Sequence, residues 1–278
     1  MAERKKRRVL PGFGFSLGVS VTFVSLILLL PMSALVRELS HLTWSGYWEI
    51  ITNPQTLAAL RVTLLSAFWA SVFNCAAGVL LAWVLARYRF PGRGILDALI
   101  DLPFALPTAV AGLTLSALFA EDGWYGVWLS LFGIKVSYTW LGIVVAMAFT
   151  SIPFVVRTVE PVLEDLGKST EEAAETLGAT KGQIFRRVIL PEILPSVAAG
   201  TTLAFCRSLG EFGAVIFIAG NIAYETEVLS LMVFMRLQEF DYPAASAIAS
   251  LVLALSLALF LFANFLQKRL ARRLGAPA

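Results

Sequence analysis

Long runs of apolar residues, interrupted by short polar segments, dominate the hydrophobic pattern of this chain. A helix needs about 20 mostly apolar residues to cross a lipid bilayer. Six stretches approach or exceed this length: Phe15–Val36, Val62–Ala86, Ala98–Phe119, Trp140–Val156, Ile193–Ala219 and Ala244–Leu266. The pattern therefore predicts an all-α, polytopic membrane protein with six spanning helices.

The composition agrees with this prediction. Hydrophobic residues make up 58% of the 278 residues, and charged residues make up only 15%, whereas soluble domains average about 25% charged residues. The chain has one histidine, His41, and two cysteines, Cys75 and Cys206, which lie within apolar runs. These residues predict neither a disulfide framework nor a metal site nor a Ser-His-Asp triad, and no cofactor is expected.

The basic residues predict the orientation. Of the 22 Lys and Arg residues, 17 lie in the N-terminal segment, in the second and fourth connections between runs, or in the C-terminal segment. The positive-inside rule then places both termini in the cytoplasm. We expect a basic segment 1–14, a lipid-embedded domain 15–267 and a basic tail 268–278, with no role in nucleic-acid binding. The first run is longer than the apolar core of a signal peptide, so an uncleaved helix is expected.

The fourth connection contains Gly167, Lys168 and Ser169, which match the end of a phosphate-binding loop, G-x-x-x-x-G-K-[ST]. The first glycine of that motif would stand at position 162, which is Val162. The whole connection, about residues 157–192, is also too short for a nucleotide-binding α/β domain. We therefore expect no nucleotide site in this chain.

The same connection predicts two short helices joined by a glycine. Capping boxes, in which the residue pairs Ser169/Glu172 and Thr180/Gln183 satisfy the first backbone N–H groups, would start the helices. Gly178 suits the left-handed end of the first helix, and Pro191 is expected to end the second. Such a hairpin suits docking into a groove on a partner. It suits equally a connector that packs on its own helical bundle.

The stretch EAAETLGATKGQIFRRVILP resembles the EAA loop of the permease subunits of ABC importers. The resemblance implies the transmembrane fold of a type I importer, in which this loop forms a coupling helix that seats in a cleft of a separate ATPase subunit. It also implies that ATP is hydrolysed by that partner and that this chain is not an enzyme. Seven residues match the motif or lie within it. We expect them to form the ATPase-coupling surface: Glu172, Ala173, Ala174, Leu177, Gly178, Leu190 and Pro191.

Two further stretches, CRSLGEFGAVIFIAGN and RLQEFDYPAASAIAS, are similar to sulfate/thiosulfate permeases of the CysT type. This likeness implies an importer in the bacterial inner membrane, with two ATPase copies, a second, CysW-like permease and an external substrate-binding protein. Molybdate permeases carry a stretch related to the first of these, so another oxyanion, molybdate or tungstate, is the alternative substrate.

Two charged residues in the fifth run are candidates for the substrate path. A charge at the centre of a spanning helix costs on the order of 3 kcal/mol. Because Arg207 and Glu211 are four residues apart, they share a helix face and offset each other. The pair either locks the bundle or lines the path. Prolines in the third run predict a kink or a hinge there. The hypothesis for the path comprises Arg207, Ser208, Glu211, Pro107 and Thr108.

Functions from other classes fit less well. A membrane-embedded enzyme would need paired carboxylates or His and Ser groups at membrane depth, and the sequence offers only Glu211 and Asp101, on different runs. A secondary transporter or a channel would work without an ATPase and would not need a capped EAA loop.

Overall fold

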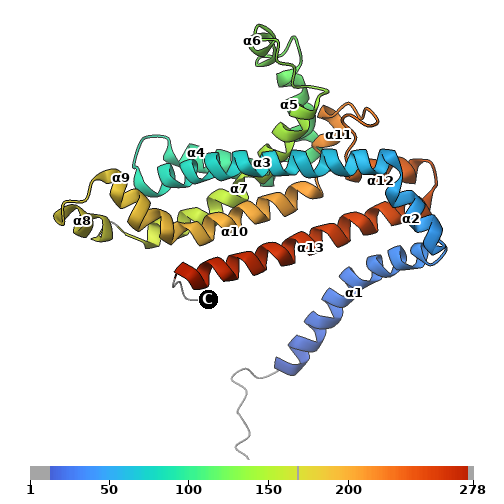
Figure 1. Cartoon of the computed structure of the whole chain (residues 1–278), viewed down its shortest axis with the longest axis horizontal. Helices are drawn as coiled ribbons and strands as arrows, with labels where there is room; N and C mark the ends of the chain where they lie inside the picture. The colour runs from blue at the N-terminus through green and yellow to red at the C-terminus, as the bar shows by residue number, and fades with distance from the viewer. Residues whose placement is uncertain (1–12, 168, 275–278) are drawn as a thin grey trace, which may run out of the picture.

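The computed structural model describes residues 13–167 and 169–274, and its regular elements in that part are all helical (Figure 1). Lys168, most of the predicted basic N-terminal segment and the end of the predicted tail lie outside the described residues. The elements, in chain order, are α1 Phe13–Leu39, α2 Trp44–Thr52, α3 Pro54–Arg87, α4 Arg93–Ala105, α5 Thr108–Phe119, α6 Gly126–Ser130, α7 Trp140–Asp165, α8 Ser169–Thr176, α9 Lys181–Ile184, the π-helical turn η1 Phe185–Ile189, α10 Leu190–Leu209, α11 Val215–Ile218, α12 Leu229–Gln238 and α13 Tyr242–Leu274.

Five described helical stretches are long and apolar enough to cross a membrane, and a sixth candidate is the bent pair of α4 and α5. The predicted span Ala98–Phe119 contains the kink or hinge that its prolines indicate, but the change of direction is large, since α4 and α5 meet at an angle of 114°. The bend follows from Pro107, which has no N–H group and disfavours helical geometry in the residue before it. Leu106 accordingly adopts an extended conformation.

The fifth run also differs from the prediction. The helical stretch begins at Lys181, and α10 ends at Leu209, so residues 210–214 interrupt the predicted helix Ile193–Ala219. Pro191 does not end the second short helix, because the chain stays helical from α9 through η1 into α10. The π turn ends at Ile189, two residues before Pro191, and its wider spacing accommodates a residue that cannot donate a backbone hydrogen bond.

The core of the molecule is formed by α3, α7 and α10, which lie side by side along its long axis (Figure 1). Small residues let these helices approach closely, as membrane helices commonly do. Gly78 of α3 faces Val155 of α7, and Gly200 of α10 lies against the backbone of the same residue. Helix α13 packs on α10 and α12, whereas α1 packs on α13 and has no buried residue.

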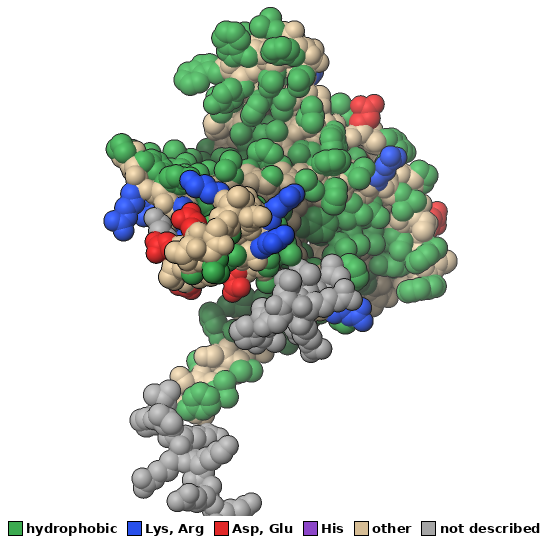
Figure 2. Space-filling view, turned by 60° about the vertical axis from the view of Figure 1, so that its left-hand side comes forward, with side chains coloured by type: hydrophobic (Ala, Val, Ile, Leu, Met, Phe, Trp, Pro, Cys, Tyr) green, Lys and Arg blue, Asp and Glu red, His purple; other side chains and the backbone are tan. Residues whose placement is uncertain are grey.

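Charged side chains gather at one end of the long axis, around α8 and α9 (Figure 2). Much of the remaining surface in this view is hydrophobic. Exposed Leu, Val, Ile and Phe side chains cover α1 and the outer faces of α3 and α13. This surface matches the lipid-facing surface that the hydrophobic runs predict, with a polar end at α8 and α9.

The close contact between α5 and the chain before α11 generates a test of the fold. A Cβ atom added to Gly112 would overlap the backbone of Ala214, which cannot rotate away as a side chain could. Gly112→Ala should therefore destabilise the protein by about 1–3 kcal/mol. The measurement is the thermal unfolding temperature in detergent.

The matched control is Gly94→Ala, whose Cβ would meet no atom within 4 Å. Equal unfolding temperatures for the two variants would contradict the packing of α5 on this segment.

Candidate functional site

The first candidate site is the helical hairpin of α8 and α9. The predicted turn is confirmed, since Gly178 has a φ of +82°. The N–H of Ala179 donates to the carbonyl of Ala174, which closes the turn. The capping box of Thr180 and Gln183 is also present, with both reciprocal hydrogen bonds. These local interactions form the hairpin that the sequence predicts, at the end of the molecule where the charges gather.

The hairpin has an inner and an outer face. Ala174 and Ala179 pack against the hydrophobic cluster at the adjoining ends of α3, α7 and α10. Glu172 and Ala173 are exposed, and the side chain of Leu177 is 88% exposed. The outer face therefore presents an apolar side chain that the chain itself leaves uncovered.

The remaining residues of the predicted coupling surface lie apart from this face. Leu190 is partly exposed and Pro191 is half-buried, both at the start of α10 beyond the π turn. They belong to the continuous helix that leads from the hairpin into the bundle. The structure thus places Glu172 and Ala173 on α8 and Leu177 directly after its end, and it places the Leu-Pro ending one helix further along.

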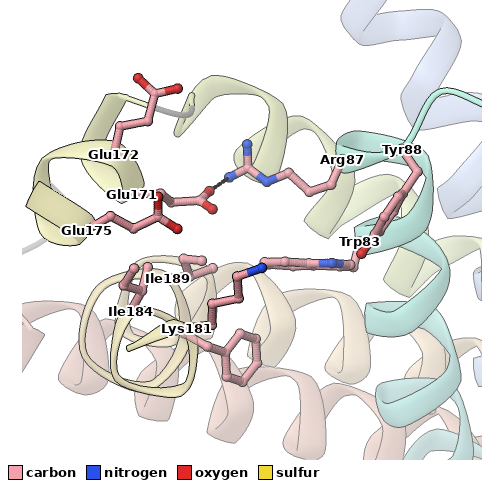
Figure 3. Close-up of a pocket in the computed structure, with 10 residues that line it drawn as sticks. Trp83, Arg87, Tyr88, Glu171, Glu172, Glu175, Lys181, Ile184 and Ile189 are labelled. Atoms are coloured by element: carbon pink, nitrogen blue, oxygen red, sulfur yellow. Dashed lines mark ion pairs between the residues drawn. The ribbon is translucent and has the colours of Figure 1, made fainter. Parts of the chain in front are cut away.

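A pocket of about 430 Å³ opens between the end of α3 and the hairpin (Figure 3). At its side, Arg87 forms an ion pair of 2.6 Å with Glu171. The guanidinium carbon of Arg87 also lies 5.7 Å from the centre of the Trp83 ring. The residues that line the pocket are Trp83, Arg87, Tyr88, Glu171, Glu172, Glu175, Lys181, Ile184, Phe185 and Ile189.

The second candidate site is the junction where two interrupted helices meet. The ion pair predicted from spacing is present, with 2.8 Å between Arg207 and Glu211. The location differs from the prediction, because Arg207 lies in the last turn of α10 and Glu211 lies beyond the helix end. The Glu211 side chain is 1% exposed and that of Arg207 is 37% exposed.

The carboxylate of Glu211 also organises the chain after the break. Its second oxygen accepts a hydrogen bond of 3.0 Å from the N–H of Ala214, at the start of α11. The carbonyl of Glu211 accepts a hydrogen bond of 2.6 Å from the hydroxyl of Ser230 in α12. Two of the polar groups beside the break, the N–H of Ala214 and the carbonyl of Glu211, are therefore satisfied within the protein.

The break between α4 and α5 lies against the same segment. A Cβ on Gly213 would overlap the side chain of Thr108, the first residue of α5. Pro107 is exposed beside it, at the bend. The structure thus brings Pro107 and Thr108 of the predicted path next to the segment that contains Glu211.

Ser208 belongs to a different arrangement from the one that we expected. It is fully buried, and its hydroxyl lies 3.1 Å from the hydroxyl of Ser151 in α7. The amide of Asn74 in α3 donates to the same Ser151 hydroxyl, at 2.8 Å. This polar seam joins the three core helices, so Ser208 does not face an open path here. Sequence reasoning missed the seam because its members come from three separate runs.

Sequence reasoning also missed a charged cluster on α4 and α7. Arg157 lies 2.7 Å from Asp97, 2.7 Å from Asp101 and 2.8 Å from Glu160. The i,i+4 spacing of the two aspartates was the available sign, but nothing in the sequence pairs α4 with α7. Asp101 is therefore engaged by an arginine, which removes it as a free carboxylate for an enzyme.

The described residues offer no candidate metal site. No group of three or more His, Cys, Asp or Glu residues in that part of the chain is arranged to hold a metal ion. Both cysteines are free.

On the loop between α6 and α7, Lys135 hydrogen bonds to Glu121, and this contact lowers the pKa of the Glu121 carboxyl group.

Comparison with known proteins gives close relatives over almost the whole chain. It is 70% identical over 267 residues to the "Sulfate transport system permease protein CysT" of Escherichia coli strain K12, covering 96% of each chain. It is 45% identical over 250 residues to the protein of the same name from a Synechocystis species, covering 90% of this chain and 87% of the relative.

Solved structures show the same fold. A bacterial ABC transporter that imports the acidic polysaccharide alginate superposes with a TM-score of 0.76 at 20% identity, over 92% of this chain and 95% of that chain. The same type of transporter in complex with an alginate-bound periplasmic protein gives a TM-score of 0.74 at 22% identity, over 93% and 95% of the two chains.

The family model for the inner membrane component of binding-protein-dependent transport systems matches residues 76–276. This range includes both candidate sites, from the pocket-lining Trp83 to the junction at Glu211. The chain therefore belongs to the family of binding-protein-dependent transport system inner membrane components, the permease subunits of ABC importers.

Proposed function

We propose that this permease subunit translocates sulfate, and thiosulfate with it, in an ATP-driven importer. The observation that carries the proposal is the 70% identity, over nearly the full length, to a protein named as a sulfate transport permease. Relatives with the same name at 45% and 44% identity support it as well.

The chemistry of the junction fits a conduit better than a tight binding site. A sulfate ion held strongly needs several converging hydrogen-bond donors. Among the described residues at the junction, Arg207 is the one cationic side chain, and Glu211 already neutralises it. Selection of the anion then falls to a separate substrate-binding protein outside the membrane, which delivers it to the permease.

The path in this proposal runs past the junction of the two broken helices. Arg207 and Gly210 supply its accessible wall, and Pro107 and Thr108 lie close by, whereas Ser208 takes part in the buried seam. Helix ends offer unpaired N–H groups and carbonyls, which irregular backbone at membrane depth can direct toward a water-filled cavity. This arrangement requires water to reach Gly210.

The hairpin of α8 and α9 is the proposed contact with the ATPase. Its support is the exposed Leu177, directly after a helix that carries charge, a surface that suits a groove on a partner. The charged end with α8 and α9 then faces the cytoplasm, and both termini lie on that side. The complex contains two ATPase copies and a second, CysW-like permease.

Uptake of labelled sulfate tests the substrate. Cells that lack the gene are expected to regain sulfate uptake when the gene is restored, and unlabelled thiosulfate should compete with it. Unlabelled molybdate serves as the comparison anion. Sulfate uptake that is the same with and without the gene would leave the importer fold intact and assign it another anion.

Gly178→Val tests the coupling surface. A β-branched residue at a φ of +82° is strained by about 1–3 kcal/mol, so the turn between α8 and α9 should distort. The variant is expected to insert in the membrane at the normal level but to retain less ATPase subunit on purification. Gly94→Val, in α4 and outside the hairpin, is the control, because its Cβ meets no atom within 4 Å and its φ is ordinary. Normal ATPase retention by Gly178→Val would argue against this surface.

A further inference from the structure

The first helix of the hairpin is weakly anchored by hydrophobic contact. Helix α8 has no buried residue, and among the helices it packs mainly on α9. On its inner side, Ala174 is the residue that touches the hydrophobic cluster of the bundle. A methyl group contributes little contact area, so apolar packing alone does not fix the position of α8 relative to the bundle.

Arg87 supplies a polar attachment at this place. It is the last residue of α3, and its guanidinium pairs with Glu171 in the first turn of α8 at 2.6 Å. A second guanidinium nitrogen donates to the carbonyl of Gly167 at 3.4 Å. One side chain of α3 therefore contacts both the end of the α7–α8 connection and the start of α8.

The surroundings of Arg87 distinguish this ion pair from ordinary surface pairs. The side chains of Arg87 and Glu171 are 9% and 24% exposed, whereas those of the neighbouring pair Arg93 and Glu164 are 40% and 51% exposed. The Trp83 ring lies beside the guanidinium, as Figure 3 shows. A pair shielded in this way is screened less by salt than an exposed one and holds a more definite geometry.

The attachment leads directly into the rigid part of the molecule. Helix α3 runs unbroken from Pro54 to Arg87 and packs along α7 and α10. A displacement of α8 would therefore pull on the end of a helix that is fixed along its length against the core. Without the ion pair, α8 could move on its turn at Gly178 while the bundle stayed in place.

We propose that Arg87 is a positioning residue that links α8 to α3 through Glu171, so that movement of the hairpin is transmitted to the bundle. This inference rests on the proposed function, in which α8 contacts the ATPase. Arg87 itself lies behind the binding surface, since its side chain is only 9% exposed. Its loss should uncouple ATP hydrolysis from transport without preventing assembly.

The test uses the whole importer, with its ATPase, second permease and sulfate-loaded binding protein, reconstituted in proteoliposomes. The quantity measured is sulfate transported per ATP hydrolysed, together with the amount of ATPase that co-purifies. Arg87→Glu and Glu171→Arg should each lower this ratio by about tenfold, within the range typical of coupling between sites. The double variant, which restores the ion pair with its charges exchanged, should recover most of the ratio.

Arg89→Glu is the matched control. It makes the same charge change two residues further on, at an exposed position for which no ion pair with a described residue is present. It should leave the ratio unchanged. An Arg87→Glu variant that behaves like this control, or a double variant that recovers nothing, would overturn the inference.

Two further results keep the inference separate from assembly and from the proposed function. If Arg87→Glu fails to assemble, the second variant is Glu171→Gln, which removes the charge from a partly exposed side chain and keeps its shape. An unchanged amount of sulfate transported per ATP hydrolysed in Glu171→Gln would overturn the inference. If the unaltered complex neither transports sulfate nor hydrolyses ATP in response to the loaded binding protein, the proposed function fails first.

Discussion

The buried carboxylate of Glu211 is the group on which the arrangement of the membrane domain depends. A helix interrupted at membrane depth exposes backbone groups that lipid cannot satisfy. Glu211 meets this requirement by pairing with Arg207 before the break and by accepting from the N–H of Ala214 after it. A lone buried carboxylate would be costly, so Glu211 requires the charge of Arg207 beside it. The segment after the break packs closely against the start of α5, where Gly213 meets Thr108.

The two proposed sites are connected by continuous helices. The helical stretch from Lys181 to Leu209 begins in the hairpin and ends at the junction with Arg207 and Glu211. Helix α3 lies alongside it, with Arg87 at the hairpin end and Asn74 in the polar seam with Ser151. This geometry offers two physical routes from the proposed ATPase contact to the proposed path. It also explains why small residues line the core, since close packing lets the helices move as one body.

The sequence predicts the local features well and the long-range ones poorly. The apolar runs give the spanning helices, and the glycine and capping box give the hairpin, because these depend on neighbours in the chain. The bend at Pro107 appears in the sequence only as a possible kink, since its size depends on what packs against it. The end of α10 at Leu209 is hidden, because the interrupting segment GEFGA is short and the apolar stretch VIFIA follows it. The partners of Arg157 and Ser208 come from other helices and leave no mark in the local pattern.

The central claim is that the junction of the two broken helices borders a water-filled anion path, and thiol accessibility tests it most directly. Gly210→Cys would place a thiol in open space beside the junction, and Gly18→Cys would place one on the exposed apolar face of α1. Both are made in a chain whose Cys75 and Cys206 are replaced by Ala. A charged, water-soluble thiol reagent should label Cys at position 210 of the assembled importer, more slowly with sulfate present, and should not label position 18. If a lipid-soluble reagent labels both positions and the water-soluble reagent labels neither, the junction lies against lipid, and the account is contradicted.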